Sequence, residues 1–285
     1  MAFIIPSSFQ NNLKGPVVSE VFLLEFSIYL ITGAFVGLAA GLLGIGGGLI
    51  IVPVLASALT YFIDPSQTVH IAIATSLATI FVTSLSSAYA HHKQGAVRWD
   101  VFKMLTLGVL AGAFMGGWVS QYIEANTLAK IFGILELLIA LSMLLALKPN
   151  PSRQLPGFAG NSLAGSIIGS VASVIGIGGG TLTTPYQVWN NISMHQAIAT
   201  SAAISLPVAL AGSIGYILAG MQATDLPAYT TGYIYWPAFF GIILTSVFTA
   251  PIGAKLAHKL PIKTLKRVFG VFLMVLGIKM LFFTN

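Results

Sequence analysis

Long apolar segments make up most of this 285-residue chain. Ten such segments can be drawn, and most hold about the 20 residues that a helix needs to cross a bilayer. Only 7% of the residues are charged, whereas a soluble domain carries about 25%. The sequence therefore predicts an all-α fold, a polytopic transmembrane helical bundle. The apolar segments cover residues 21–43, 49–63, 69–90, 100–120, 127–147, 160–175, 181–192, 195–219, 232–250 and 265–283.

Two of these segments are short, and each follows the same glycine-rich run. The run Gly-Ile-Gly-Gly-Gly occupies Gly44 to Gly48 and returns letter for letter at Gly176 to Gly180. We expect the helices to be broken at both runs. Because a short segment need not cross the bilayer by itself, the expected number of membrane segments is eight to ten.

The two halves of the chain are copies of each other. The runs that start at Gly44 and Gly176 have an offset of 176 − 44 = 132. The block His-x-Ala-Ile-Ala-Thr-Ser starts at His70 and again at His195, an offset of 125. Further on, Phe-Gly at 132–133 matches Phe-Gly at 269–270, an offset of 137. Three blocks in one order predict that a unit of nearly half the chain has been duplicated.

This duplication divides the chain into four parts. Residues 1–20 form an N-terminal tail, and residues 21–147 form the first transmembrane repeat. Residues 148–157 are polar, basic and rich in proline, which is typical of a linker. Residues 158–285 form the second transmembrane repeat. Each repeat is expected to hold about five helices.

Charge in the loops predicts that the repeats are inverted. Short cytoplasmic loops collect Lys and Arg. The loop 91–103 is basic, whereas its counterpart between residues 220 and 233 has no Lys or Arg; the next pair of loops shows the opposite pattern, with the basic member at 255–267. We therefore expect inverted-topology repeats, with both termini outside, in the cell inner (plasma) membrane. His91 and His92, beside Lys93, are expected at the surface.

The glycine runs are candidates for an anion site. A broken helix exposes backbone N–H groups, which a membrane tolerates only where they are buried in protein or line a wet cavity. The start of a helix also carries the positive end of its dipole, which attracts anions. The alternative is close helix packing, for which small residues are also suited. The candidate substrate-binding residues here are Gly46, Gly47, Gly48, Gly178, Gly179, Gly180 and Thr181.

Hydroxyl pairs in the repeated block are further candidates. Thr75 and Ser76, with Thr200 and Ser201, can donate hydrogen bonds to an oxyanion without adding charge. Alternatively, each hydroxyl bonds back into its own helix. Three polar residues of the second half, Tyr186, Gln187 and Gln196, are expected to make the site asymmetric.

Proton coupling has three candidate residues. Histidine titrates near neutral pH, so His70 or His195 can carry a proton, or either can cap a helix at the interface. Glu136 lies in the middle of an apolar segment, and an ionisable residue at that depth is a functional hypothesis by default. A structural, hydrogen-bonded Glu136 is the alternative.

With its two Gly-Ile-Gly-Gly-Gly runs and two His-x-Ala-x-Ala-Thr-Ser blocks, the sequence resembles the sulfite exporter TauE/SafE family over about residues 25–283. The resemblance implies a carrier of sulfur-containing anions such as sulfite or organosulfonates. It also implies coupling to a proton gradient, without fixing the direction of transport.

Other classes of function fit the sequence less well. The chain has no cysteine, no His-Glu-x-x-His motif and no paired membrane carboxylates, so we expect no enzyme activity, catalytic residue, metal or cofactor. Its net charge of +6 lies mainly in loops, which favours a role in topology over nucleic-acid binding. The expected partners are a small anionic substrate and the lipid bilayer, and a homo-oligomer is left open. The alternatives are an anion channel through the same pore, a carrier of a different small anion, and cation transport.

Overall fold

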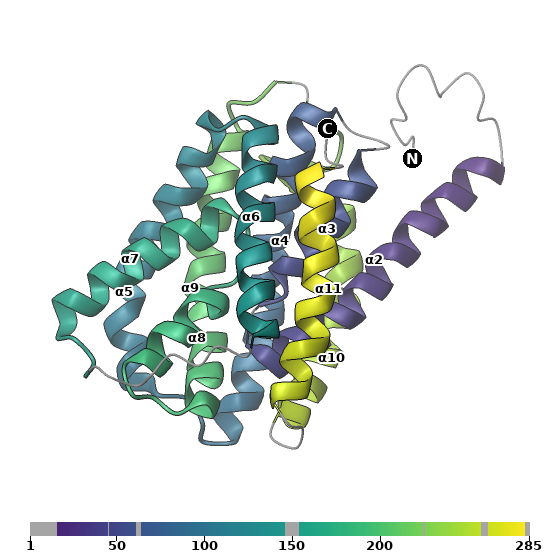
Figure 1. Ribbon diagram of the computed structural model, residues 1–285. Coiled ribbons are helices and arrows are strands. Elements are labelled where there is room, and N and C mark those ends of the chain that lie inside the picture. Colours follow the sequence, from purple (N-terminus) through teal and green to yellow (C-terminus); the bar gives the residue numbers. More distant parts are fainter. Residues whose placement is uncertain are drawn as a thin grey trace.

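The structure is a computed structural model that describes residues 16–44, 46–60, 64–145, 154–224, 226–257 and 262–282, with the side chains of 16–23 and 262–266 left out. Residues 1–15 of the expected tail and 148–153 of the expected linker lie outside this part. The described chain is almost entirely helical (Figure 1). The helices are α2 (Pro16–Leu43), α3 (Gly48–Leu59), α4 (Pro65–Lys93), α5 (Trp99–Val119), η1 (Ser120–Tyr122), α6 (Ala125–Leu144), α7 (Phe158–Val174), α8 (Gly180–Trp189), α9 (Met194–Gly220), α10 (Trp236–Ala257) and α11 (Ile262–Phe282), with the antiparallel strands β1 (Thr230–Thr231) and β2 (Ile234–Tyr235) before α10.

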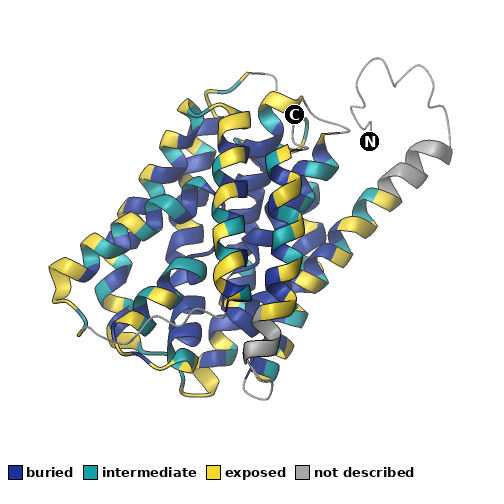
Figure 2. Cartoon of the chain, viewed as in Figure 1, coloured by how far each residue is buried: buried dark blue, intermediate teal, exposed yellow. Residues whose placement is uncertain are grey.

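Six helices within the described residues are long and apolar enough to cross a membrane. Figure 2 shows that the exposed residues lie on the outward sides of the helices, and many of them are large and apolar, such as Phe35, Ile134 and Phe248. An apolar surface of this extent suits lipid contact. These features confirm the predicted all-α polytopic membrane protein. The six spans are Leu24–Leu43, Pro65–Lys93, Trp99–Tyr122, Ala125–Leu144, Met194–Gly220 and Trp236–Ala257.

The helices pack in pairs that join the two halves of the chain. In Figure 1, α6 and α11 stand side by side at the front, and α5 lies with α7 on the left. The helix α2 packs on α10, and α4 packs on α9. Each of these pairs takes one helix from each half, so the halves form a single bundle.

Glycines allow the outer pairs to approach closely, and the same contact occurs twice. A Cβ added to Gly33 on α2 would lie 2.2 Å from the carbonyl oxygen of Ile242 on α10. A Cβ added to Gly165 on α7 would lie 2.6 Å from the carbonyl oxygen of Leu105 on α5. The numbers of Gly33 and Gly165 differ by 132 and those of Leu105 and Ile242 by 137, the offsets that relate the halves in the sequence. The packing of α2 on α10 is therefore matched by that of α7 on α5.

The helix breaks lie where the glycine runs predict them. Gly44, Gly46 and Gly47 have φ angles of 66°, 75° and 86°, and Gly176 has 68°, a left-handed backbone that glycine adopts without a steric penalty. The helices that follow are short, with 12 residues in α3 and 10 in α8. Their prolines, at positions 53 and 185, lie inside the helices rather than in the first turn.

We predict that Gly33→Ala and Gly165→Ala each destabilise the bundle, because the added methyl group would overlap a backbone carbonyl oxygen that side-chain rotation cannot move. Overpacking of this kind costs about 1–3 kcal/mol. Thermal unfolding of the detergent-purified protein measures the effect. The control is Gly157→Ala, where an added Cβ meets nothing within 4 Å. Melting temperatures equal to that of the control would contradict the prediction.

Candidate functional site

The two glycine runs meet inside the protein, although they belong to different halves of the chain. A Cβ on Gly46 would lie 2.9 Å from the Gly178 Cα, and a Cβ on Gly48 would lie 2.3 Å from the Gly176 carbonyl oxygen. All four residues are buried. We call these four residues the glycine junction. Since α3 and α8 start there, the positive ends of two helix dipoles converge on one enclosed region.

Each run also packs against the repeated block of the opposite half. A Cβ on Gly44 would lie 2.5 Å from the Ile198 carbonyl oxygen on α9, and one on Gly176 would lie 3.0 Å from the Ile73 Cα on α4. These two contacts are equivalent under the sequence offsets. In addition, Ser76 Oγ donates a hydrogen bond to the Gly176 carbonyl oxygen at 2.9 Å. The junction is therefore enclosed by α4 and α9, the two helices that carry the predicted hydroxyls.

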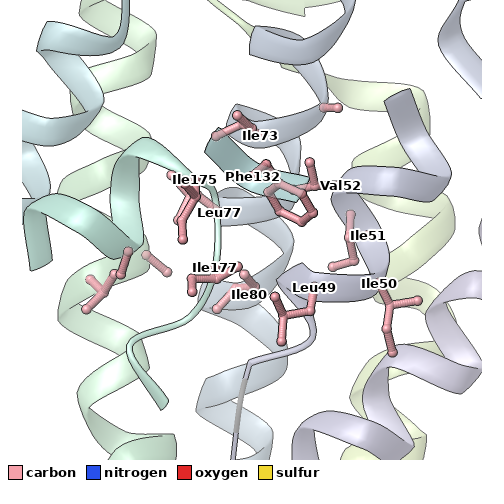
Figure 3. Close-up of a cluster of buried hydrophobic side chains, with 14 of the residues drawn as sticks. Leu49, Ile50, Ile51, Val52, Ile73, Leu77, Ile80, Phe132, Ile175 and Ile177 are labelled. Atoms are coloured by element: carbon pink, nitrogen blue, oxygen red, sulfur yellow. The ribbon is translucent and has the colours of Figure 1, made fainter. Parts of the chain in front are cut away.

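On the side of α3, the junction is packed with apolar side chains (Figure 3). Leu49 of α3, Ile80 of α4 and Ile177 of the second run lie together there, each with at most 1% of its surface exposed. The structure thus shows a closed centre in which apolar side chains cover the start of α3.

On the side of α8, the neighbouring side chains are polar. Ser201 Oγ on α9 lies 2.7 Å from Thr183 Oγ1 and 3.0 Å from Thr184 Oγ1. The amide of Gln187 donates to the same oxygen at 2.9 Å. We call Thr183, Thr184, Gln187 and Ser201 the hydroxyl cluster. Thr183, Gln187 and Ser201 are fully buried, so the cluster places polar side chains in the interior of the bundle.

The start of α8 is tied to this cluster through Ser205. The Gly180 N–H donates to Ser205 Oγ at 3.2 Å, and Ser205 Oγ donates to the Ser201 carbonyl oxygen at 3.0 Å. Two enclosed polar atoms of α8 have no hydrogen-bond partner among the described residues: Thr181 Oγ1 in its first turn, and Gln187 Oε1, an acceptor, in its last turn. The start of α8 therefore combines a helix dipole, hydroxyl groups and unused hydrogen-bonding capacity.

The two threonines of the repeated block make equivalent hydrogen bonds, each to a backbone N–H group of the other half of the chain. Thr75 Oγ1 accepts a hydrogen bond from the Tyr235 N–H at 2.9 Å, and Thr200 Oγ1 accepts one from the Arg98 N–H at 2.9 Å. Tyr235 and Arg98 directly precede α10 and α5, and they are again related by the offset of 137. Both hydroxyls thus fix the start of a neighbouring helix, while their role in substrate binding stays a prediction.

The two histidines of the repeated block lie in different environments. His70 is buried, its Nε2 lies 3.1 Å from the carbonyl oxygens of both Ser120 and Ile123, and its ring stacks on the Tyr233 ring at 5.2 Å between centroids. His195, at the start of α9, is exposed. Glu136 is fully buried on α6, and its carboxyl oxygens have no hydrogen-bond partner among the described residues.

His70 also lines a cavity of about 820 Å³ at one end of the bundle. The cavity lies between the start of α4, the segment from Gln121 to Asn126, and Tyr233. Ser76, which touches the glycine junction, is six positions further along α4, roughly 9 Å along the helix axis. The cavity therefore lies at the end of α4 from which the repeated block leads toward the junction.

The prediction for His91 was wrong. His92 is exposed as expected, but only 1% of His91 is exposed, and its Nε2 lies 3.2 Å from the Gly41 carbonyl oxygen on α2. The reason is that α4 continues to Lys93, so His91 is still on its inward face. The sequence reasoning also missed Thr183, Thr184 and Ser205, which an aligned comparison of the two repeats would have shown as polar replacements of apolar residues.

In the described part of the chain, six candidate membrane spans and two helix starts buried at the centre are typical of multi-pass membrane transporters. The family model for the sulfite exporter TauE/SafE family matches residues 29–280, so the chain belongs to that family. No solved structure matches the chain.

Curated relatives of the chain are named as probable membrane transporters. A probable membrane transporter protein of Haemophilus influenzae is 37% identical over 88% of this chain and 96% of its own length. One from Methanocaldococcus jannaschii is 29% identical over 91% of this chain and 97% of its own length. A third, from Bacillus subtilis, is 26% identical over 91% and 98%, respectively. The chain is thus a membrane transporter and not an enzyme.

We predict that Thr75→Val and Thr200→Val each destabilise the protein, because each leaves a backbone N–H without its acceptor. Both groups are partly buried, so leaving one unpaired costs about 1 kcal/mol, the lower end of the range for buried groups. The control is Thr106→Val, whose hydroxyl bonds only to the Phe102 carbonyl oxygen of its own helix. Thermal unfolding should rank both variants below the control, and equal stability would contradict the assigned contacts.

Proposed function

We propose that this transporter is a secondary active carrier of small sulfur-containing oxyanions, of the sulfite or organosulfonate type. The observation that carries the proposal is the meeting of the two glycine runs, which directs two helix starts at one buried region. Backbone N–H groups and helix dipoles bind anions without a charged side chain. The hydroxyl of Ser201 and the unpartnered hydroxyl of Thr181 add further donors on the α8 side.

The scarcity of buried positive charge supports a carrier that releases its substrate. No lysine or arginine among the described residues is buried. A charged side chain at the junction would hold a sulfonate through a strong, charge-assisted hydrogen bond. Dipoles and hydroxyl groups bind the same anion more weakly, which suits a cycle of binding and release.

The proposed mechanism is alternating access between two inverted repeats. Transporters of this kind bind substrate near the midplane, at the interface of the repeats. The basic loops support inversion, with both termini on the outer side of the inner membrane. The matched packing of α2 on α10 and of α7 on α5 supports two equivalent units that move against each other. In this cycle, the conformation in which Leu49, Ile80 and Ile177 pack together is an occluded state, closed to both sides of the membrane.

We predict that Gly46→Ala and Gly48→Ala reduce uptake of sulfite or ethanesulfonate into proteoliposomes at least tenfold, because each added methyl group enters the glycine junction. Ser76→Ala tests the same region without adding volume, and it should also slow uptake. Gly157→Ala is the control. Gel filtration and thermal unfolding establish that each variant is folded.

Full uptake by folded variants at both glycines would contradict the proposed site. Counterflow that saturates with substrate concentration distinguishes the carrier from the alternative, an anion channel, which would show unitary conductance in planar bilayers.

A proton partner is part of the proposal, and His70 is its first candidate because it is buried beside the cavity. We predict that His70→Gln abolishes the acceleration of uptake by a pH gradient, with substrate counterflow retained, whereas His195→Gln leaves the acceleration unchanged. Uptake with and without an imposed gradient measures both. Coupling that persists in both variants would exclude the histidines and leave Glu136 as the candidate.

A further inference from the structure

The second half of α4 carries hydroxyl groups where the equivalent part of α9 carries none. Beyond Ser76, α4 has five serine and threonine residues, whereas the positions of α9 that match them by the offset of 125 are apolar residues or glycine. This half of α4 is therefore polar in a way that the duplication does not explain. The matched pairs are Thr79 and Ile204, Thr83 and Val208, Ser84 and Ala209, Ser86 and Ala211, and Ser87 and Gly212.

Three of these five hydroxyl groups have a structural partner. Thr79 Oγ1 donates to a carbonyl oxygen of its own helix at 2.7 Å. Thr83 Oγ1 lies 2.8 Å from Ser246 Oγ on α10. Ser86 Oγ donates to the Val247 carbonyl oxygen, also on α10, at 2.8 Å. The hydroxyls of Thr83 and Ser86 thus hold α4 against α10.

The remaining two hydroxyl groups, those of Ser84 and Ser87, are buried without a partner. Each serine has 1% of its surface exposed, and neither Oγ has a hydrogen-bond partner among the described residues. Serine in a helix often bonds back to its own backbone, but these two do not. An unpaired buried hydroxyl costs about 1–3 kcal/mol, so buried polar groups are normally paired. Two such groups three positions apart on one helix indicate a place for a ligand.

Ser84 and Ser87 belong to one row of side chains along α4. Positions 80, 84, 87 and 91 follow each other at intervals of four, three and four, which places them on one face of a helix. Ile80 is the first member of the row and His91 is the last. The surroundings of these two residues therefore show what the serines between them face.

Both ends of the row meet the break between α2 and α3. The Ile80 Cδ1 lies 3.0 Å from where a Cβ on Gly48 would be, at the start of α3. His91 Nε2 lies 3.2 Å from the carbonyl oxygen of Gly41, two residues before the end of α2. The serines between them therefore face the segment from Gly41 to Gly48.

This segment supplies oxygen ligands and a negative potential. The last carbonyl groups of a helix have no N–H partner within it, and the negative end of the helix dipole lies there. The helix α2 ends at Leu43, and the left-handed backbone of Gly44, Gly46 and Gly47 interrupts the helix before α3. Residues 26–48 and 65–93 contain no Asp or Glu. Uncharged oxygen atoms without a carboxylate suit a monovalent cation better than a divalent one.

We propose that Ser84, Ser87 and the carbonyl groups at the end of α2 form a sodium site, and that the ion is transported together with the anion. In carriers with broken helices, helix starts bind anionic substrate groups, whereas unwound carbonyl groups and helix ends bind the coupling cation. The inference rests on the proposed function and adds a second ion to it. The sodium site is separate from His70, which lies on the other side of Ser76 along α4.

The physical reason for a cation here is charge balance. No lysine or arginine among the described residues is buried, so the protein itself supplies no positive charge for a buried anion. Ser84 is four positions beyond Ile80, roughly 6 Å along the helix axis, so an ion beside it attracts an anion at the glycine junction through a medium of low dielectric constant. A positive charge that leaves with the substrate strengthens binding without preventing release. By linkage, sodium and the anion raise each other's affinity by the same factor.

The test measures sodium binding and anion binding separately in the full-length protein. Thermal unfolding in mixtures of NaCl and KCl at constant total salt gives the half-saturating sodium concentration. Isothermal titration with potassium ethanesulfonate, with and without sodium, gives the anion affinity. Ser84→Ala and Ser87→Ala each remove one proposed ligand. The matched control is Ser86→Ala, on the same helix, whose hydroxyl bonds to α10.

We expect sodium, but not potassium, to raise the melting temperature of the wild-type protein and to tighten ethanesulfonate binding by roughly tenfold. Ser84→Ala and Ser87→Ala should each raise the half-saturating sodium concentration by roughly tenfold or more. Ser86→Ala should leave this concentration unchanged. Cooperative unfolding in KCl alone establishes that each variant is folded.

Two results would overturn the sodium site and leave the proposed function intact. One is a wild-type protein that transports ethanesulfonate equally well in sodium and in potassium. The other is a wild-type sodium response in both Ser84→Ala and Ser87→Ala, which would mean that the two hydroxyls bind only water. Failure of the proposed function is a different result, in which the wild-type protein transports neither sulfite nor ethanesulfonate in either salt.

Discussion

Two helices of this membrane protein begin inside the bundle, and the backbone N–H groups there, which have no partner within their own helix, are the constraint on which the rest of the structure depends. The first N–H groups of a helix have no partner within it, and lipid offers none. Both starts are therefore enclosed, by α4, by α9 and by the opposite glycine run. Only glycine permits the approach of Gly46 to Gly178 and of Gly48 to the Gly176 carbonyl oxygen.

The parts of the structure that depend on local sequence could be predicted. Segment length and apolarity determined the helices, and the glycine runs predicted both breaks, because a left-handed backbone is a property of the residue itself. Contacts between distant segments were not accessible in this way. Thr75 on α4 meets the backbone amide of Tyr235 in the other half of the chain, and the burial of His91 depends on which face of α4 packs against α2.

The two halves of the chain share backbone contacts but differ in the side chains at the centre. Backbone contacts are duplicated in detail, as Gly33 with Ile242 and Gly165 with Leu105 show. The side chains at the centre have diverged, so that Ile80 and Ser205 face equivalent helix starts with opposite chemistry. A symmetric frame suits two access states of similar stability, whereas an asymmetric centre suits the recognition of one substrate in a defined orientation. The exchange of Ile80 for Ser205 can be read from the sequence. Its consequence became clear only from the structure, in which the starts of α3 and α8 meet.

The most direct test of the account is a crystal structure with bound 4-bromobenzenesulfonate, in which anomalous scattering locates the bromine and the sulfonate is placed from density. The account predicts sulfonate oxygens beside the glycine junction, within hydrogen-bonding distance of Thr181 in the first turn of α8 or of Ser201 on α9. A sulfonate bound in the cavity beside His70 with none at the glycine junction would contradict it.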